Sequence, residues 1–226
     1  MKCKNKIICG DFRDYTELFQ GDRKYIISDP PYNQRYHYSS YGDDMQLNEY
    51  TDMLLEAFSG YNSVVIHYPE ETINVLSKAM YADWCEQSIA WVYNSNTGKQ
   101  HRIITWWNCR PDMDRIKQPY KNVDDKRIAE RILNGEQARL YDWWEINQVK
   151  NVSKGKDDHP CPIPYELAKK IIILTTDEGD TIIDPFSGSG TICKAAQDLK
   201  RNFIGIEISP EYCKIAEQRL KQKPLF

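Results

Sequence analysis

Short apolar runs typical of buried strands alternate along this chain with segments of helical periodicity. Residues 24–28 (KYIIS), 63–67 (SVVIH) and 202–207 (NFIGIE) contain β-branched apolar side chains, and the segment 48–59 carries its apolar residues at helical spacing. Strands that alternate with helices predict a mostly parallel sheet with helices on both faces. The sequence therefore indicates an α/β fold.

The alternation of strands and helices is regular in the N-terminal and C-terminal parts of the chain and is interrupted between residues 94 and 158. The expected strands are residues 6–9, 24–28, 63–67, 88–93, 103–109, 181–184 and 202–207, and the expected helical segments are 16–19, 48–59, 70–81, 124–133, 164–175, 192–199 and 211–221. In the segment 70–81, one face would carry Ile73, Leu76 and Met80. A chain of 226 residues is expected to form one domain, 1–226, with residues 94–158 inserted as a variable segment.

Composition argues against several classes of protein. No apolar run approaches the roughly 18 residues of a membrane span, and the apolar run 7–9 is too short for a signal peptide. The seven cysteines are scattered without a CxxC pair, which indicates a reduced, cytoplasmic chain, and no metal site is expected. Residues 94–158 carry a net charge of +3 against −6 elsewhere, which fits a polyanionic partner and fits a solvated surface equally well.

The run SDPPYN, residues 28–33, follows the strand 24–28 in an unusual way. A turn would more often use Asp-Gly or Asn-Gly, whereas two adjacent prolines fix the backbone dihedral φ and stiffen the chain. The run holds a carboxylate, Asp29, close to an aromatic ring, Tyr32. A stiff backbone at this point indicates a site.

A glycine-rich run, DPFSGSGT at residues 184–191, joins the strand 181–184 to the helix 192–199. Glycines let a ligand approach the backbone, and the free N–H groups of a helix N-terminus attract a carboxylate or phosphate. The run is neither a Walker loop nor the dinucleotide GxGxxG pattern. About twenty residues on, the next strand ends at Glu207, where an acid can accept hydrogen bonds from ribose hydroxyls. A site for an adenosine-containing ligand is expected here, with a tight turn and an ordinary surface Glu as the alternatives.

DPPY at residues 29–32 together with DPFSGSGT at 184–191 resembles the motif pair of the S-adenosylmethionine-dependent amino-methyltransferases of DNA. DPPY precedes the glycine run here, with a variable basic segment between them, and this order is similar to that of the β group found in restriction–modification systems and phages. Gly10-Asp11 and residues 159–164 (HPCPIP) resemble two further motifs of that group. The resemblance implies a Rossmann-like class I methyltransferase fold with circularly permuted motif order.

The resemblance also implies an activity, which is methylation of an exocyclic amino group in double-stranded DNA. Adenine N6 is the expected target because DPPY is commoner in the adenine enzymes, whereas the N4-cytosine enzymes more often carry SPPY. N4-cytosine stays open, since this preference is statistical. A homodimer and a cognate restriction endonuclease are further partners that such a family admits.

The chemistry explains why these residue types are needed. An exocyclic amino group is a poor nucleophile because its lone pair is delocalised into the ring. Asp29 and the backbone carbonyl of Pro30 would each accept one of its N–H bonds, which aims the lone pair at the methyl group for in-line displacement. Tyr32 would stack on the base, which must leave the duplex to be reached. No covalent intermediate is required, so no cysteine is required.

Roles for the cofactor residues follow from the resemblance alone. Asp11 would bind the adenine amino group of the cofactor and Glu207 its ribose, while Asp29 would also lie beside it. Around its methionine part, the expected residues are Asp184 at the ammonium, Phe186, Gly188, Gly190 and, near the carboxylate, Thr191. Ile163 stands where the family usually has a Lys or Arg, which puts one expected contact in doubt.

Substrate contacts are expected on both sides of the catalytic run. Residues 34–41 (QRYHYSSY) would form a lid or a plain polar loop, and the expected substrate-binding residues are Tyr32, Asn33, Arg35, Tyr36, Arg102 and Arg110. Arg102 and Arg110, with Arg115, Lys117 and Lys121, are the candidates for phosphate contacts. The tryptophans at 106, 107, 143 and 144 are expected in the core of a small subdomain.

Three alternatives compete with this interpretation. Pro160-Cys161 is the nucleophile signature of C5-cytosine methyltransferases, but the partners of that cysteine are not visible and DPPY would go unexplained. Protein and RNA N-methyltransferases also carry [DN]PPY, usually after the glycine run. A non-catalytic nucleic-acid-binding relative would not need Asp29, Tyr32 and the intact glycine run.

Overall fold

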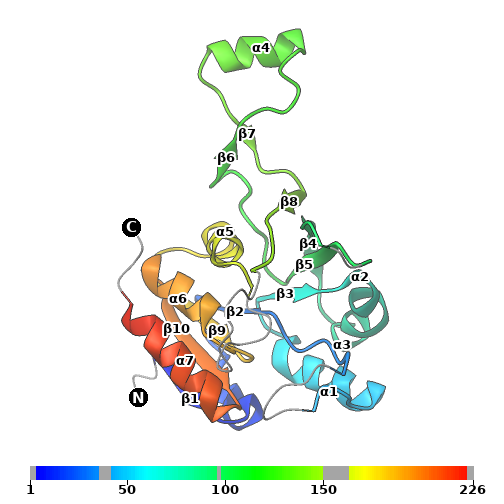
Figure 1. Ribbon diagram of the computed structural model, residues 1–226, viewed down its shortest axis with the longest axis vertical. Helices are drawn as coiled ribbons and strands as arrows, with labels where there is room; N and C mark the ends of the chain where they lie inside the picture. The colour runs from blue at the N-terminus through cyan, green and yellow to red at the C-terminus, as the bar shows by residue number, and fades with distance from the viewer. Residues whose placement is uncertain (1–3, 36–41, 96–97, 150–162, 223–226) are drawn as a thin grey trace.

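The computed structural model describes residues 4–35, 42–95, 98–149 and 163–222, and within these ranges eight strands form the main sheet (Figure 1). Across the sheet the strands are β1 (Lys6–Cys9), β10 (Asn202–Glu207), β9 (Thr181–Asp184), β2 (Lys24–Ser28), β3 (Ser63–His67), β5 (His101–Trp107), β4 (Cys85–Val92) and β8 (Trp143–Glu145). Neighbours pair in parallel except where β5 lies between β3 and β4. The expected mostly parallel α/β sheet is confirmed.

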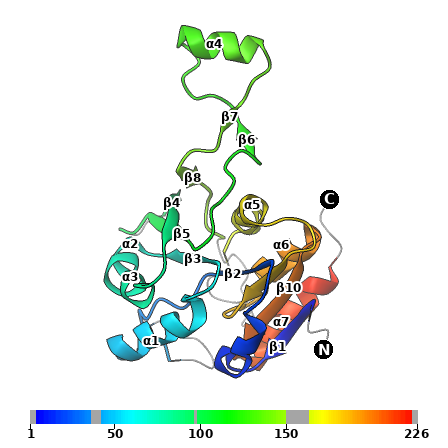
Figure 2. The same cartoon turned by 180° about the vertical axis from the view of Figure 1, so that it is seen from behind.

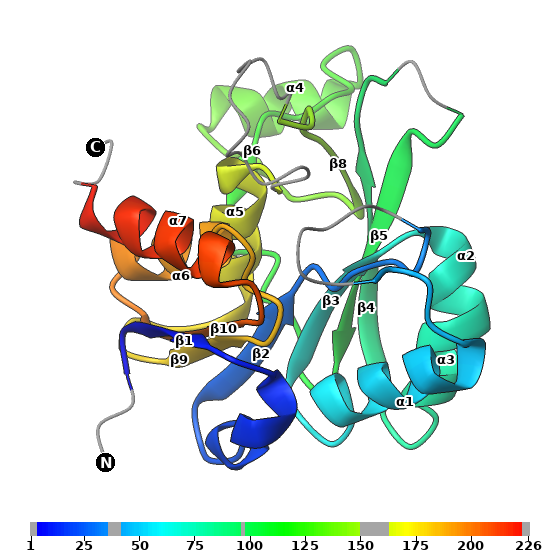
Figure 3. The same ribbon diagram turned by 60° about the horizontal axis from the view of Figure 1, so that its bottom comes forward.

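Helices cover both faces of this sheet, in two layers that Figure 3 shows on opposite sides. One layer contains α5 (Tyr165–Thr175), α6 (Thr191–Asp198) and α7 (Pro210–Lys221). The other contains the 3₁₀ helix η1 (Phe12–Leu18), α1 (Leu47–Phe58) and a helical segment made of α2 (Pro69–Glu71), η2 (Thr72–Leu76) and α3 (Ser77–Ala79). In the described part of the chain, no helix is both long and apolar enough to cross a membrane.

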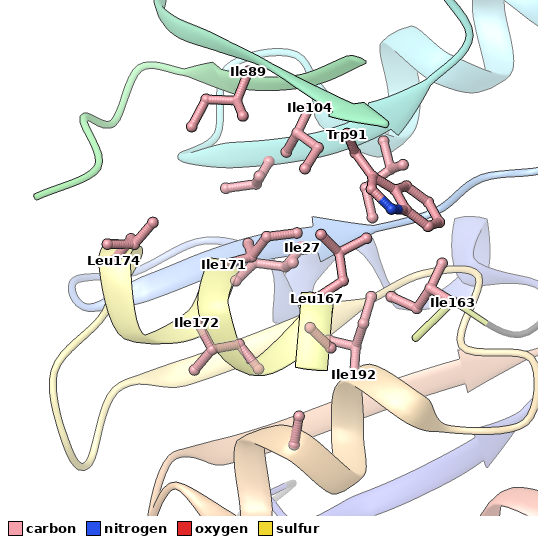
Figure 4. Close-up of a cluster of buried hydrophobic side chains, with 14 of the residues drawn as sticks. Ile27, Ile89, Trp91, Ile104, Ile163, Leu167, Ile171, Ile172, Leu174 and Ile192 are labelled. Atoms are coloured by element: carbon pink, nitrogen blue, oxygen red, sulfur yellow. The ribbon is translucent and has the colours of Figure 1, made fainter. Parts of the chain in front are cut away.

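Each helical layer packs on the sheet through its own apolar cluster. On one face, Ile27 and Trp91 of the sheet belong to the cluster that includes Leu167 and Ile171 of α5 (Figure 4). On the other face, Val65 and Ile183 cluster with residues of α1. Because adjacent residues of a strand point to opposite faces, the near-continuous apolar runs of the central strands are needed to fill both clusters.

The helical segment 70–81 does not form the regular helix that its spacing predicts. Its middle, η2, is a π-helix, which hydrogen-bonds to the fifth residue instead of the fourth and so rotates the buried face. Leu76 and Met80 are buried as predicted, but Ile73 is 70% exposed and Val75 takes its place in the core. The predicted position of Ile73 is therefore wrong.

The predicted insertion 94–158 contains two strands of the main sheet, because β5 and β8 lie within it. Residues 108–142, which we call the arm, leave the sheet between β5 and β8: β6 (Lys117–Gln118) and β7 (Ala138–Arg139) form a two-stranded ladder, and α4 (Lys126–Leu133) lies at the far end. Figures 1 and 2 show the arm extending away from both helical layers.

The tryptophans do not form a separate small core. Trp106 and Trp144 are buried in the cluster shared with α5, and Trp107 belongs to the cluster on the other face of the sheet. Trp143 is partly exposed at the edge strand β8. The prediction of a subdomain core is wrong because the runs that carry these residues pair with the central sheet.

Candidate active site

The carboxyl ends of β1, β10, β9, β2 and β3 meet at one edge of the sheet. The register aligns Cys9 with Glu207 and Gly205 with Asp184, so the segments that follow these strands become neighbours. The antiparallel strand β5 begins at the same edge, since Ile103 pairs with His67 at the end of β3. Ligands of parallel α/β sheets bind outside this edge.

A cavity of about 230 Å³ opens there. The predicted site residues that line it are Asp11, Asp29, Pro30, Tyr32, Arg102, Asp184, Phe186, Gly188, Thr191 and Glu207. The DPPY run and the glycine-rich run, far apart in the sequence, thus face a common space. Further lining residues are Gly10, Phe12, Tyr68, Ile208 and Tyr212.

The Asp29 carboxylate contacts one residue of its own loop and one residue of β5. The Tyr32 hydroxyl donates a hydrogen bond to Asp29 Oδ1, and Arg102 Nη1 lies 3.6 Å from Asp29 Oδ2. Burial raises the pKa of Asp29, while the positive charge of Arg102 and the Tyr32 hydrogen bond act in the opposite direction. The carboxylate is therefore held between a hydroxyl and a guanidinium at the wall of the cavity.

The backbone of the second proline, Pro31, is held by residues that the sequence did not single out. The Tyr50 hydroxyl donates to the carbonyl of Pro31 (2.9 Å) and lies 3.2 Å from His67 Nε2. Because a hydroxyl has one hydrogen to give, His67 Nε2 must donate to Tyr50, which leaves Nδ1 as the unprotonated nitrogen. Burial lowers the pKa of His67 to about 3, so the ring is neutral.

Asn33 and Arg35 shape the loop and do not line the cavity. Both have positive φ, and the Asn33 backbone N–H donates to Asp43 Oδ1 (2.8 Å) while its side-chain amide donates to Met45 (2.9 Å). The Arg35 side chain is exposed. Tyr36, His37, Tyr38 and Cys161 lie outside the described residues.

Glu207 fixes the glycine-rich turn. Its two carboxylate oxygens accept hydrogen bonds from the backbone N–H groups of Gly188 and Ser209, each at 2.8 Å. Gly188 has φ of +49°, and Gly190 has φ of +76°, with an added Cβ only 2.8 Å from that of Ala216 in α7. Gly190 therefore lies behind the cavity, where close packing of α6 on α7 requires a glycine.

Asp184 is buried beneath the same turn. Its Oδ1 accepts hydrogen bonds from the Ser28 hydroxyl (2.5 Å) and the Phe186 backbone N–H (3.2 Å). Burial raises the pKa of Asp184 to about 7, and the nearby carboxylates of Asp29 and Glu207 act in the same direction. A cationic group in this cavity would meet an acidic wall.

The lining residues fit S-adenosylmethionine. Acidic acceptors stand at Asp11, Asp184 and Glu207, the ring of Phe186 provides apolar surface, and Thr191 opens α6, whose N-terminus attracts a carboxylate. The buried hydroxyl of Ser187 has no hydrogen-bond partner in the described ranges, which leaves a polar group for a ligand. Ile163 is a buried core residue at the cavity wall (Figure 4), so an apolar contact replaces the basic one of the family pattern.

One of the predicted phosphate contacts is corrected by the structure, and a second, Arg115, stays a prediction. Arg102 is only 4% exposed, so a DNA phosphate cannot reach it. Arg115 donates to the carbonyls of Ile173 (3.1 Å) and Thr176 (2.6 Å) and anchors the arm to the end of α5.

The other three candidates stand on or beside the arm. Arg110 is exposed at the base of the arm, past the far end of β5, and does not line the cavity. Lys117 is paired with Asp114 (2.6 Å), and Lys121 Nζ lies 3.3 Å from the ring centroid of Trp143. None of these three residues lines the cavity, and their role as phosphate contacts stays a prediction.

Family comparison decides the class of protein. A family model described as DNA methylase (N6_N4_Mtase) matches residues 24–218, which span both the DPPY run and the glycine-rich run. The chain belongs to this family. The resemblance to the amino-methyltransferases of DNA is thereby confirmed.

Individual relatives agree with this assignment. The type II methyltransferase M.HpaI of Haemophilus parainfluenzae is 27% identical over 240 residues, which cover 95% of this chain and 74% of that protein. The type II methyltransferase M2.DpnII of Streptococcus pneumoniae is 40% identical over 108 residues, or 48% of this chain. That match spans only 38% of M2.DpnII, well under two thirds of its length.

Solved structures support the fold. A complex of M1.HpyAVI with S-adenosylmethionine (SAM) superposes with a TM-score of 0.63 at 22% identity, covering 96% of this chain and 99% of that one. The cytosine-N4-specific PvuII DNA methyltransferase superposes with a TM-score of 0.67 at 16% identity, covering 97% and 87%. The predicted methyltransferase fold is thus confirmed.

Proposed function

We propose that this chain transfers a methyl group from S-adenosylmethionine to the exocyclic N6 of adenine in double-stranded DNA. The observation that carries the proposal is the shared cavity, in which the Asp29 carboxylate faces the glycine-rich turn and Glu207. The family supplies the reaction class, and the M1.HpyAVI complex provides a precedent for the cofactor.

The catalytic work falls to the DPPY loop. Bound S-adenosylmethionine would supply an electrophilic methyl group. Asp29 and the Pro30 carbonyl would accept hydrogen bonds from the two N–H groups of the target amino group and turn its lone pair towards that methyl. In the protein without DNA, the Tyr32 hydroxyl donates a hydrogen bond to Asp29. When DNA binds, the target amino group replaces that hydroxyl as the donor to Asp29, and the Tyr32 ring stacks on the extruded base.

The remaining lining residues hold the cofactor. Asp11 takes the adenine amino group, and Glu207, whose carboxylate is held in place by the backbone N–H groups of Gly188 and Ser209, takes the ribose hydroxyls. Asp184 takes the methionine ammonium. Phe186 and Gly188 contact the methionine part, and Thr191 lies near its carboxylate at the start of α6.

DNA is the proposed partner outside the cavity. Asn33, Arg35 and Tyr36, which follow the catalytic run in the sequence, are the proposed substrate contacts. The arm within segment 94–158, with Arg110 at its base, is the proposed recognition element. Because the proposed substrate is chromosomal or phage DNA, we expect the enzyme to act in the cytoplasm. A homodimer and a cognate endonuclease are compatible with this role.

N4 of cytosine is the second candidate substrate. The observation that favours it is the TM-score of 0.67 with a cytosine-N4-specific enzyme. Both bases present an exocyclic amino group that Asp29 and Pro30 can hold in the same way. The DPPY form of the run favours adenine, because the N4-cytosine enzymes more often carry SPPY.

Nucleoside analysis tests the proposal directly. Unmethylated DNA is incubated with the protein and S-adenosylmethionine, digested and analysed for N6-methyladenine and N4-methylcytosine. We expect N6-methyladenine alone. Appearance of N4-methylcytosine would reassign the base, and the absence of both would refute the function.

The substitution Asp29→Ala ties the activity to this site. The Asp29 carboxylate acts mainly in the transition state, so kcat should fall by several orders of magnitude while DNA affinity and Tm change little. Near-normal turnover of a folded Asp29→Ala protein would remove Asp29 from the mechanism.

A further inference from the structure

A buried guanidinium stands beside the proposed catalytic carboxylate. Arg102 comes from the second position of β5, is 4% exposed, and approaches Asp29 Oδ2 to 3.6 Å. Its central carbon lies 4.9 Å from the ring centroid of Tyr32 and 5.2 Å from those of Tyr68 and Trp91. Three aromatic rings and one carboxylate therefore surround a single positive charge.

Arg102 is not placed for stability alone. Removing a charge from water is costly unless its hydrogen bonds are replaced, and Arg102 Nε is buried without a partner among the residues that the structure describes. A well-packed apolar side chain at the start of β5 would avoid that cost. The position of Arg102 at the cavity wall suggests that its charge serves the site.

Among the residues that the structure describes, Arg102 is the cation that acts on the charge of Asp29. Burial alone favours the protonated acid, and Arg102 opposes it. The other groups that face Asp29 do not supply positive charge: Tyr32 is a neutral donor, His67 is neutral, and Asp184 of β9 is acidic. Tyr68, after β3, contributes a neutral phenol on the far side of the guanidinium.

We propose that Arg102 is a positioning residue, which keeps Asp29 ionised and turned towards the target amino group. This inference rests on the proposed function, because the ionised carboxylate is the acceptor that the amino group needs. The contacts with the rings of Tyr32, Tyr68 and Trp91 restrict the movement of the guanidinium beside Asp29. Arg102 thus acts through Asp29 and not on DNA phosphates.

Two substitutions separate charge from shape. Arg102→Gln removes the charge and keeps a polar side chain, whereas Arg102→Lys keeps the charge and loses the planar fork. The rate constant kcat is measured across the pH range in which each protein stays folded, with S-adenosylmethionine and DNA both saturating. Under saturation the acid limb reports the assembled complex, so protonation of Asp184 in the free protein does not shape it.

The acid limb of kcat should move up by about 1–3 pH units in Arg102→Gln, the usual effect of losing an adjacent opposite charge. Activity of this variant should recover at high pH, and Arg102→Lys should show much less shift. A matched control is Arg201→Gln, which removes a half-buried arginine that donates to Thr176 and Leu199 at the opposite edge of the sheet. This control should lower Tm without moving the limb.

An equal fractional loss of kcat at every pH in Arg102→Gln, or an equal shift of the limb in both Arg102 variants, would overturn the inference. The pKa of the Asp29 carboxyl is followed in parallel by carbon NMR on the protein without DNA, and should be higher in Arg102→Gln than in the wild type. If the wild type methylates no base, the proposed function fails, and the NMR comparison still decides whether Arg102 controls the charge of Asp29.

Discussion

Tyr32 has two interactions in the proposed site, one through its hydroxyl and one through its ring. Its hydroxyl donates to Asp29, and its ring contacts Arg102, His67 and Tyr68. Stacking on an extruded base requires the Tyr32 ring to turn away from part of this cluster, which breaks the hydrogen bond and frees Asp29. In the proposed mechanism, the hydroxyl therefore competes with the target amino group for the same carboxylate.

Substitutions of Tyr32 test this competition. Tyr32→Phe keeps the stacking face and removes the competing donor, so much of the turnover should remain. Tyr32→Ala removes the stack and should weaken binding of the extruded base by roughly 1–3 kcal/mol. The measurements are Tm and the affinity for DNA with a matched or mismatched base opposite the target.

A mismatch lowers the energy of unpairing, so the wild type should bind mismatched DNA more tightly. Tyr32→Ala should lose part of this preference. A destabilised Tyr32→Ala protein with an unaltered mismatch preference would place Tyr32 in the core instead of the active site.

The raised pKa of Asp184 predicts that cofactor binding depends on pH. Its pKa of about 7 means that Asp184 is largely protonated in the free protein below that pH. A bound ammonium favours the carboxylate, so binding must expel a proton below pH 7, and S-adenosylmethionine affinity should fall by about tenfold per pH unit there. Calorimetry in buffers of different ionisation enthalpy should detect the proton; Asp184→Asn should bind weakly without this slope.

The glycine-rich turn is constrained by a neighbouring helix as well as by a ligand. Gly190 is the N-cap residue that precedes α6, with φ of +76°, and an added Cβ would lie 2.8 Å from that of Ala216 in α7. Gly60 offers a matched control, since its φ is +79° and an added Cβ would meet nothing within 4 Å. Of these two glycines, Gly190 combines the left-handed backbone with the close approach.

Gly60→Ala should lower the free energy of unfolding by about 1–2 kcal/mol, the strain of a left-handed alanine. Gly190→Ala should lower it further, because α7 must shift, and should also weaken cofactor binding. Denaturant unfolding of the two variants gives the comparison. Equal losses would show that α7 accommodates the extra methyl group.

Sequence reasoning works best where one element obeys one local rule. The strands 6–9, 24–28, 63–67, 181–184 and 202–207 are confirmed at both ends, because each is a short apolar run closed by turn residues or by the acids of the site. The segment 70–81 fails because the π-helix depends on packing against the sheet and not on spacing. Arg102, Tyr50 and His67 reach the site through strand register and helix packing, which no local pattern encodes.

The arm is the part of the molecule least tied to the fold. Its ladder of β6 and β7 pairs Gln118 with Ala138, and α4 beyond it has no buried residue. The sequence predicts a variable segment between the two motif runs but not its limits, because a strand expected at 103–109 can belong to the insertion or to the main sheet until its pairing with β3 and β4 is known. Everything beyond the ladder is therefore removable in principle without opening either apolar cluster.

Replacing residues 119–137 with Asn-Gly joins the paired ends of β6 and β7 by a two-residue turn, which suits that sequence. We expect Tm and S-adenosylmethionine affinity to stay near those of the wild type, because the deleted residues line neither the cavity nor the core. Sequence-specific methylation should be lost, since the proposed recognition element is gone while Asp29, Pro30 and Tyr32 are intact. A shortened protein that still methylates the same DNA sites at the same rate would show that specificity resides elsewhere, with the residues at the rim of the cavity as the next candidates.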